Sequence, residues 1–292
     1  MTEGPEATFL AEMIYQYFRG KQLRRIRILG GRYKTHGPGK GFVTFQRALP
    51  LVLTDVYKKG KVIFLIFGST TKKMASWTIV AKMGMTGWFY RGKEADAEAE
   101  GDAEAEADAG KGRPLFRSRP NVTFEFEHDD LHFFDFRNFG TLTFTNDVLD
   151  VVEEMDRLAP DVLNPYTTYE DIRSRVPLVK GELSIAEALM DQTLLMSGIG
   201  NILKSELLYD AGISPRRAVK DIEEKEWPAL ISSAKKVCKK TLEVLQRRRG
   251  DSRDEYNAIR HVYDKTVDPH GYRVRSYSSN GRTTYYVAEV QH

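Results

Sequence analysis

Residues 184–217, SIAEALMDQTLLMSGIGNILKSELLYDAGISPRR, combine helix caps, closely spaced glycines and polar side chains in a pattern that could bind an anion. Ser184 followed three residues later by Glu187 is a capping box, which predicts a helix from Ser184 to about Leu195. The Ser-Gly-Ile-Gly sequence at 197–200 then permits a tight reversal of the chain. Two helices joined by a turn are therefore predicted here.

The second helix of this pair begins at Asn201 and ends at Gly212. Because the first N–H groups of a helix have no intrahelical partner and lie at the positive end of the helix dipole, they can hold a phosphate group. The Asn201 side chain can donate a further hydrogen bond to the same anion. An ordinary helical hairpin with glycines for close packing explains the pattern equally well, so both interpretations stay open from the residues alone.

Other candidate groups are dispersed along the chain, and each has an ordinary structural explanation when taken alone. Glu3 is an acidic residue in a first helical turn, where it favours the helix dipole. Lys61 and Arg282 fit a strand-end lysine and a hairpin-turn arginine. Met85 and Phe139 are of residue types that usually belong to a core. None of them predicts an activity without its neighbours.

The first block of the chain, roughly 1–150, is expected to form one helix followed by strands. The helix, about 3–18, has apolar residues at helical spacing; Thr2 can cap it and Gly20 ends it. Strands are expected at 51–57, 62–67, 77–83, 121–127, 131–136 and 141–145. Their alternation and spacing are typical of an antiparallel β-sandwich or barrel.

A second block, 151–261, is expected to be helical, and a third, 262–292, to be a β-hairpin. The helical segments are 150–158, 168–175, 184–195, 201–211 and 221–248. In the third block, Asn280-Gly281 between two strand-like runs is the strongest short signal for a hairpin. The chain is therefore assigned to the α+β class, with domains at 1–150, 151–261 and 262–292.

The stretch 92–112, GKEADAEAEGDAEAEADAGKG, contains no large apolar side chain. Such a segment cannot offset its ordering entropy by burial, so a disordered insert is expected. A solvated spacer is favoured over the alternative, a DNA-mimicking or partner-binding segment. Two of the 44 basic and eight of the 41 acidic residues lie here, so the remainder carries a net charge of +9. That charge suits a polyanionic partner.

Composition narrows the class of protein further. A length of 292 residues suggests one large or two ordinary domains. The single cysteine, Cys238, excludes an intrachain disulfide framework and a multi-cysteine zinc site. No apolar run reaches ~18 residues, so no membrane span is expected. The N-terminus, MTEGPEATF, is acidic and polar and is not a secretory signal. An intracellular location fits these observations.

Five further strings accompany the 184–217 segment. They are MTEGPE at the N-terminus, KKGKVIF around Lys61, KMGMTG at 82–87, DFRNFG at 135–140 and GRTTYYVAEVQ at 281–291. In this order, together with LMDQ and SGIGNI.KSELL..AGISP, they resemble the motifs of the formamidopyrimidine-DNA glycosylase / endonuclease VIII family. The resemblance extends over nearly the whole chain except the acidic insert. It implies a helix and two-layer antiparallel β-sandwich, then a helix–two-turn–helix domain with a C-terminal finger.

The resemblance also implies a catalytic set. The nucleophile is the α-amine of Thr2, exposed when Met1 is removed, which attacks C1′ of the damaged nucleoside and forms a Schiff base. Glu3 is the implied general acid/base. Glu6 resembles the family's second N-terminal acid, with an implied role as a positioning hydrogen-bond partner. Lys61 is the implied clamp on a phosphate beside the lesion.

A DNA-binding set follows from the same resemblance. Arg282 and Asn201 are the implied phosphate contacts. Met85, Arg137 and Phe139 match the trio that fills the gap left by a flipped base: an apolar wedge, an arginine for the orphan base and a stacking aromatic. The implied partner is damaged DNA, duplex or single-stranded, bound by a monomer that does not associate with membranes.

The implied finger lacks the usual metal ligands. Residues 269–271 stand where the family has one Cys-x-x-Cys pair, and Val287 and Val290 replace the second pair. The resemblance therefore implies a zincless finger held by apolar packing, with no metal and no cofactor. The six histidines form no ligand pair and are expected to be structural.

Three positions depart from the family's usual pattern. Thr2 stands where most members have proline, Lys82 replaces the loop histidine, and Ala186 replaces a helix lysine of the formamidopyrimidine branch. The last change, together with the GNILKSELL string and the absent zinc ligands, favours the endonuclease VIII-like or zincless eukaryotic-type branch. The expected function is a DNA glycosylase and abasic-site lyase of base excision repair, acting where DNA is, in the nucleus if the source is eukaryotic. The alternative is a damaged-DNA-binding protein of the same fold with weakened or lost catalysis.

Overall fold

The computed structural model describes residues 2–69, 76–92, 119–247, 257 and 259–292. The chain divides into two compact units, the first comprising Met1–Thr2 and Glu6–Met155, the second Glu3–Pro5 and Asp156–His292. Thr2 and Glu3 therefore belong to different units although they are consecutive. The predicted acidic insert, apart from Gly92, lies outside the described residues.

Helix α1 (Gly4–Phe18) occupies the predicted N-terminal position. Its spacing of three and four residues buries one face, on which Ala7, Leu10 and Ile14 are fully enclosed. The predicted cap by Thr2 is wrong, because α1 begins at Gly4 and residue 3 therefore occupies the N-cap position. The Thr2 hydroxyl donates to the carbonyl of Gly87, 2.6 Å away.

One eight-stranded antiparallel sheet forms most of the first unit. Its strands are β1 (Gln22–Ile28), β2 (Leu51–Lys59), β3 (Val62–Ser69), β4 (Ser76–Lys82), β5 (Trp88–Gly92), β6 (Val122–Phe126), β7 (Asp130–Phe134) and β8 (Thr141–Thr145). They lie in the order β5-β7-β6-β1-β2-β3-β4-β8. The six predicted strands are all present, and β1 and β5 are additional.

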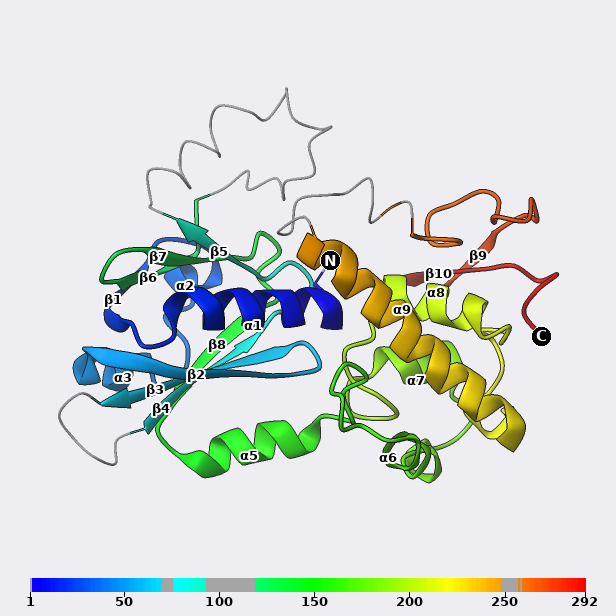
Figure 1. The fold of residues 1–292 in the computed structure, drawn as a ribbon, viewed down its shortest axis with the longest axis horizontal. Helices are drawn as coiled ribbons and strands as arrows, with labels where there is room; N and C mark the ends of the chain where they lie inside the picture. Colours follow the sequence, from blue (N-terminus) through cyan, green and yellow to red (C-terminus); the bar gives the residue numbers. More distant parts are fainter. Residues whose placement is uncertain (1, 70–75, 93–118, 248–256, 258) are drawn as a thin grey trace, which may run out of the picture. The chain divides into compact units, whose positions relative to one another are not determined.

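The sheet folds over into the two layers of a sandwich. Strands β1 and β2 pair through only Gln22↔Val52 and Leu23↔Leu51, whereas β2 and β3 pair along their length. Figure 1 shows β5, β6 and β7 apart from β2, β3 and β4. Apolar residues of α1 and of both layers form one core, which the short helices α2 (Gly31–Thr35) and α3 (Phe42–Ala48) join through Tyr33 and Phe45.

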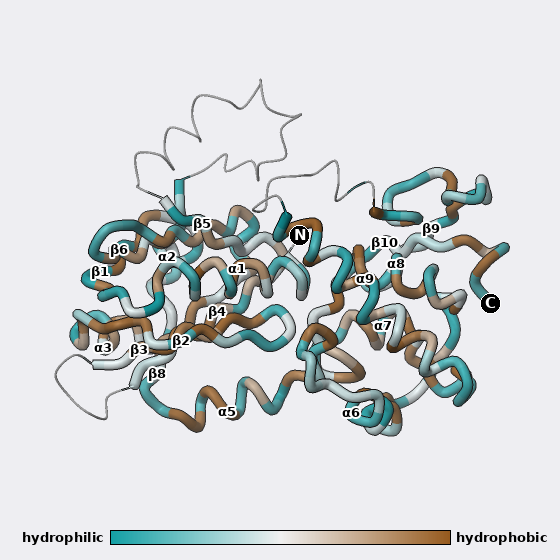
Figure 2. The backbone as a smooth tube through the Cα atoms, viewed as in Figure 1, coloured by the Kyte–Doolittle hydropathy of each residue, from teal (hydrophilic) through white to brown (hydrophobic). Residues whose placement is uncertain are grey.

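Helix α5 (Val148–Arg157) follows β8, and none of its residues is fully buried. Val148, Leu149 and Val152 are exposed, and Figure 2 shows brown, apolar stretches along this helix. The helix is attached instead by polar contacts, since Lys82 forms an ion pair with Glu154 and the Lys59 ammonium donates to the carbonyl of Met155.

The second unit is helical, as predicted. Its helices are α6 (Tyr169–Arg173), α7 (Ile185–Met190), α8 (Asn201–Asp210) and α9 (Trp227–Arg247), with 3-10 turns at Val176–Leu178, Val219–Asp221 and Glu224–Glu226. They surround a core in which Leu189, Leu203 and Trp227 are buried. No helix in the described part of the chain is long and apolar enough to cross a membrane.

Two helices differ from the predicted bounds by five residues or more. The helix expected at 184–195 has the predicted capping box but ends at Met190, because the Gln192 side chain donates to the carbonyl of Ile199 and accepts from the N–H of Gly198. The last long helix begins at Trp227 instead of 221, directly after the 3-10 turn Glu224–Glu226, whose N-cap is Glu223.

The predicted C-terminal hairpin consists of β9 (Arg275–Ser279) and β10 (Arg282–Tyr286). Asn280 and Gly281 both have positive φ, 50° and 69°, as a two-residue type I′ turn requires. Val287, directly after β10, is fully buried against Tyr209 and Val262. The hairpin thus belongs to the same compact unit as the helices.

Candidate functional site

Thr2 is held against the loop at 83–87, which connects β4 to β5. Its backbone nitrogen donates to the carbonyl of Met85 at 3.0 Å and its hydroxyl to the carbonyl of Gly87 at 2.6 Å. The residue is almost fully buried. The structure therefore brings together two residues predicted from separate motifs, the Thr2 nitrogen and Met85.

The loop at 83–87 is fixed to a second loop at 135–140. The Thr86 hydroxyl donates to the Asp135 carboxylate and accepts from the N–H of Arg137, while Asp135 also accepts from the N–H of Gly140. A Cβ on Gly84, which has φ +59°, would lie 2.7 Å from the backbone of Gly140. The close approach of the two loops thus depends on glycine at position 84.

These two loops carry the three residues predicted to fill the gap left by a flipped base. Arg137 and Phe139 are exposed, Met85 is half-buried, and the Arg137 guanidinium lies 5.1 Å from the centre of the Phe139 ring. The three are not buried in separate cores. Phe136, which the sequence reasoning did not single out, is 71% exposed on the same loop.

Lys61 and Glu6 belong to the same unit as Thr2. Lys61 lies at the turn between β2 and β3, and its carbonyl accepts from the N–H of Met83 at the start of the 83–87 loop. Glu6 lies in the first turn of α1 and is almost fully buried. The first unit therefore holds the predicted nucleophile and the lysine next to one connected set of loops.

Glu3 lies at the N-terminus of α8. Its two carboxylate oxygens accept from the N–H groups of Ile202 and Leu203, each at 3.0 Å. Gly200, the N-cap residue, has no side chain that could cap α8. The Glu3 carboxylate caps the helix instead, although it lies 199 and 200 residues before Ile202 and Leu203 in the sequence. The expectation that these helical N–H groups are free to hold a phosphate was wrong for Ile202 and Leu203, because Glu3 uses them.

Position 200, in the turn before α8, has no room for a side chain. A Cβ at this position would lie 2.3 Å from the carboxyl carbon of Glu3, although its φ of −122° is open to any residue. The Gly4 N–H also donates to the carbonyl of Gly198 at 2.7 Å. The glycine-rich turn is therefore shaped to receive residues 3 and 4.

Asn201 lies at the first position of α8 and is buried. Its side-chain amide donates to the carbonyl of Thr283 at 2.9 Å, and its oxygen accepts from the Lys204 ammonium at 2.8 Å. Lys204 also donates to the Thr284 hydroxyl at 2.7 Å. Burial lowers the pKa of Lys204 to about 8, although Glu3 opposes this shift.

Arg282 opens β10 opposite Ser279, at the tip of the hairpin. The hairpin tip is fastened to α7 through Glu187, whose carboxylate accepts from the Ser279 hydroxyl at 2.7 Å and the Asn280 amide at 3.1 Å. The hydrogen bonds from the Ser279 and Ser184 hydroxyls lower the pKa of Glu187. The second unit therefore brings Glu3, Asn201 and Arg282 onto elements that are directly connected.

Polar and apolar contacts hold the finger where the resemblance would place two cysteine pairs. The Asp268 carboxylate accepts from the N–H groups of His270 and Tyr272 and from the Tyr209 hydroxyl, at 2.8–2.9 Å. Among the residues that the structure describes, no group of three or more histidine, cysteine, aspartate or glutamate side chains could hold a metal ion.

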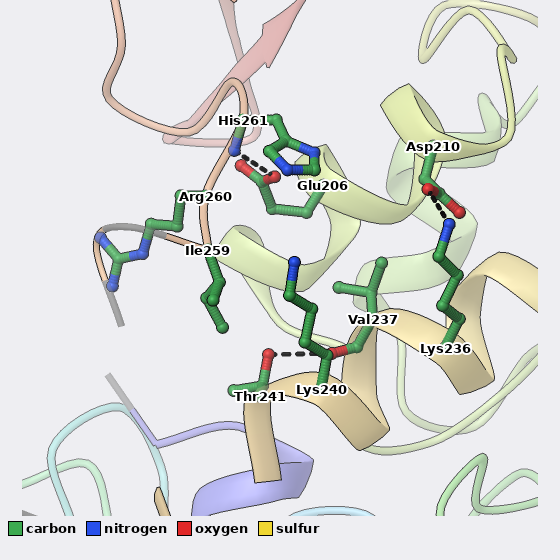
Figure 3. A pocket seen from close by; sticks show the side chains of 9 residues that line it. All are labelled: Glu206, Asp210, Lys236, Val237, Lys240, Thr241, Ile259, Arg260 and His261. Atoms are coloured by element: carbon green, nitrogen blue, oxygen red, sulfur yellow. Dashed lines mark hydrogen bonds and ion pairs between the residues drawn. The ribbon is translucent and has the colours of Figure 1, made fainter. Parts of the chain in front are cut away.

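A cavity of about 150 Å³ lies between α8, α9 and the segment that leads to the hairpin (Figure 3). None of its nine lining residues is a predicted site residue. Its acidic groups are already engaged: Glu206 accepts from the N–H groups of His261, Val262 and Tyr263, and Asp210 pairs with Lys236. The cavity therefore lies beside the hydrogen bonds that attach the segment at 261–263 to Glu206 of α8.

The sequence reasoning missed Lys204 and Asp135. The sequence did contain a signal that Lys204 is buried, because the segment 201–209 has no continuous polar face. The polar residues of such a helix must be buried with hydrogen-bond partners. Asp135 was included in the DFRNFG string but not assigned a task; it holds the loop that displays Arg137 and Phe139.

Two family models match the chain. The formamidopyrimidine-DNA glycosylase N-terminal domain matches residues 1–142, and the formamidopyrimidine-DNA glycosylase H2TH domain matches residues 158–250. The chain is 28% identical over 186 residues to a formamidopyrimidine-DNA glycosylase of Listeria innocua, covering 59% of this chain and 66% of that protein. It is 23% identical to one of Exiguobacterium sp. over 100% of this chain and 99% of the other.

Solved structures agree in fold. A complex of Lactococcus lactis Fpg with DNA containing an abasic site has a TM-score of 0.75 at 19% identity, and MutM bound to DNA containing carbocyclic 8-oxo-G has 0.76 at 19%, each covering 99% of both chains. Fold and site define an α+β protein with an N-terminal helix, an antiparallel β-sandwich and a helix–two-turn–helix unit with a hairpin. The chain belongs to the formamidopyrimidine-DNA glycosylase / endonuclease VIII family.

Proposed function

We propose that this protein is a bifunctional DNA glycosylase and abasic-site lyase of base excision repair, with the Thr2 α-amine as its nucleophile. One observation carries the proposal: residues 2 and 3 present a nitrogen beside Met85 and a carboxylate at the N-terminus of α8. Because consecutive Cα atoms are about 3.8 Å apart, the amine and the carboxylate are neighbours by covalent connection alone.

In the proposed first step, the neutral amine attacks C1′ of the damaged nucleoside. The bond from C1′ to the base breaks, and the base leaves with the electron pair and takes up a proton. The bond from C1′ to the ring oxygen then breaks, the oxygen accepts a proton, and a Schiff base remains between Thr2 and C1′. Free α-amines have pKa values of about 7.7–8.0, so a nucleophilic fraction exists near neutral pH.

Glu3 is proposed to exchange protons with the ring oxygen and, during elimination, with the sugar carbon next to C1′. The hydrogen bonds from Ile202 and Leu203 fix the orientation of the carboxylate, one bond to each oxygen. A carboxylate oxygen has two lone pairs, so a hydrogen bond from the backbone does not by itself prevent this exchange. Loss of a proton from C2′ expels the 3′ phosphate and nicks the strand.

The amine of Thr2 is proposed to determine the rate of strand nicking relative to the rate of base excision. A proline amine at this position gives an iminium that stays charged, which is a strong electron sink for elimination. A primary amine gives an imine that can lose its proton and with it part of that pull. We therefore infer that base excision proceeds through the Schiff base, and that strand nicking is slower or less complete than with proline.

DNA is proposed to be held through phosphates and the gap left by the flipped base. Lys61 and Arg282 neutralise phosphates beside the lesion. Asn201 gives one amide hydrogen to Thr283, and the other is the one proposed for a phosphate. Met85, Arg137 and Phe139 stand on mutually fixed loops, a rigid wedge suited to replace an extruded base.

The finger is proposed to hold its structure without zinc, and the enzyme to need no cofactor. The proposed active form is a monomer, and its proposed substrates are oxidised bases in duplex or single-stranded DNA. The Asp268 turn and the buried Val287 supply the cross-links that a metal supplies in other fingers. The proposed place of action is a compartment that contains DNA.

Cleavage of a duplex with one abasic site tests the function. The proposal predicts a nicked strand and, on a duplex with an oxidised base, release of that base. Binding of the damaged duplex without either product would instead support the alternative, a damaged-DNA-binding protein that has lost catalysis. A panel of oxidised pyrimidines, purines and hydantoins in duplex and single-stranded form would then rank the substrates.

A further inference from the structure

Lys204 has an unusual place for a lysine. It lies on α8, in which Asn201 to Tyr209 are all buried, and only 2% of Lys204 is exposed. Its ammonium group donates to the side-chain oxygen of Asn201 and to the hydroxyl of Thr284. The ammonium therefore joins the first turn of α8 to strand β10.

The bond to Asn201 fixes which way its side-chain amide faces. An ammonium group has donors only, so the Asn201 oxygen must point toward Lys204 and the amide nitrogen away from it. That nitrogen donates to the carbonyl of Thr283. Without the ammonium, the amide could rotate by half a turn and exchange its oxygen and nitrogen.

The bond to Thr284 fixes strand β10. Thr284 lies two residues beyond Arg282, so both side chains are on the same face of the strand. Asn201 and Lys204 together hold two consecutive residues of β10, Thr283 through its carbonyl and Thr284 through its hydroxyl. The position of Arg282 relative to α8 depends on these contacts.

We propose that Lys204 is a positioning residue that aligns Asn201 and Arg282, so that the two can grip the DNA backbone together. This proposal rests on the proposed function, because it assigns DNA contacts to Asn201 and Arg282. Lys204 itself is enclosed and acts through the two residues that it orients.

The charge of Lys204 makes the role testable through stability. Burial holds the pKa near 8, below the ordinary value of 10.5, so the folded protein disfavours the charged form. This penalty is complete below about pH 8 and disappears as pH rises toward 10.5. Methionine, similar in size and uncharged, should avoid the penalty at neutral pH.

The first experiment compares Lys204→Met, Lys204→Arg and the exposed control Lys225→Met. We expect Lys204→Met to bind a duplex with a stable abasic analogue about tenfold more weakly at pH 7, because the Asn201 amide can then rotate and Arg282 is no longer aligned with it. Lys204→Arg should recover most of the affinity, and Lys225→Met should match the unchanged protein. The melting temperature of Lys204→Met at pH 7 should not fall.

Two results would overturn the proposal. One is unchanged affinity of Lys204→Met for the abasic analogue. The other is a fall in melting temperature that accompanies the loss of affinity and is not reversed by arginine, which would make Lys204 merely structural. After borohydride trapping on cleavable DNA, a crosslink on Lys204 would also contradict a positioning role, because it would make Lys204 a nucleophile.

The pH dependence of affinity is the second experiment. Affinity of the unchanged protein for the analogue should fall as pH rises through about 8, since a neutral amine donates weaker hydrogen bonds than an ammonium. The charged groups that act on Lys204 are Glu3, Glu187 and Arg282. Lys204→Arg should lack this decline, and the same decline in all variants would refute the assignment.

The controls separate this inference from the proposed function. If the unchanged protein neither binds nor cleaves abasic DNA, the proposed function fails. If it cleaves and Lys204→Met binds equally well, only the role of Lys204 fails.

Discussion

Thr2 and Glu3 are held by hydrogen bonds to two different parts of the chain. The Thr2 nitrogen and hydroxyl both donate to carbonyls of the 83–87 loop, and the Glu3 carboxylate caps α8. Side chains fixed by several hydrogen bonds lose little freedom when substrate arrives, which is the condition for efficient proton and nucleophile chemistry.

Replacing Thr2 by proline should raise strand nicking relative to base excision. The ratio of the two single-turnover rates should increase on the order of tenfold, equivalent to about 1.4 kcal/mol of barrier, because the secondary amine keeps its iminium charged. Thr2→Val is the matched control: it removes the hydroxyl bond to Gly87 but retains a primary amine. An equal increase in both variants would assign the effect to the hydroxyl.

The roles of single residues could be predicted from the sequence only where a motif carries them. Thr2, Glu3 and Met85 were identified through strings that resemble the family, but their partners were not. The carbonyl beside Thr2 and the helix beside Glu3 are distant in sequence, so no local pattern indicates them. Lys204 was missed because a lysine is expected at the surface unless its helix is known to be enclosed.

At the scale of elements, α8 is the part of the site most constrained by its surroundings. It is buried on nearly every side, Glu3 serves as its N-terminal cap, and its polar residues Lys204 and Glu206 both bind the chain that forms the hairpin.

Gly200→Ala should displace Glu3 from α8. The added Cβ would lie 2.3 Å from the Glu3 carboxyl carbon, while the backbone itself accepts alanine. We expect excision to slow by about 100-fold and unfolding free energy to fall by about 1–2 kcal/mol through the lost cap. Gly30→Ala, whose Cβ would meet only the Pro120 carbonyl at 3.9 Å, is the control. Full activity of Gly200→Ala would show that the position of Glu3 is not critical.

The finger should be independent of metal. Elemental analysis of the purified protein should find no stoichiometric zinc, and a chelator should leave melting temperature and activity unchanged. The physical reason is that Asp268 and Val287 already fix the segments that metal ligands would join. Tightly bound zinc at one per chain would refute the zincless interpretation.

Elements with clean alternation were predicted well, and the errors have identifiable causes. Strand β1, QLRRIRI, was missed because arginines obscure its apolar positions, of which Leu23 and Ile26 are buried. Strand β5, WFYRG, has three consecutive aromatic residues without alternation, and only Phe89 is buried. Helix α7 was predicted too long because the hydrogen bonds of Gln192, which end it, involve residues of the following turn.

The arrangement of the whole first unit lay beyond sequence patterns. Strand β1 pairs with β6, almost a hundred residues later, and with β2 through only two residue pairs. Alternation shows that a residue faces the core, but it does not show which strand lies beside it. The α+β class was therefore predictable, and the strand order was not.

Charge is the property of the whole molecule that bears most directly on DNA. Residues 94–110 contain eight acids and no base, although their placement lies outside the described residues. Deleting them should strengthen binding to undamaged duplex by about three- to tenfold at 50 mM salt, with the gain lost near 300 mM, where the screening length is about 6 Å. Affinity measured over a salt series checks this. A gain that does not depend on salt would point to steric obstruction.

Borohydride reduction during reaction with an abasic-site duplex, followed by peptide mapping, tests the central claim most directly. The account predicts one covalent crosslink, located on the α-nitrogen of Thr2 in protein that has lost Met1. Protein that retains Met1 should form no crosslink, because the nitrogen is then part of a peptide bond. A crosslink on Lys61 or another lysine, or none despite a free Thr2 amine and intact DNA binding, would contradict the account.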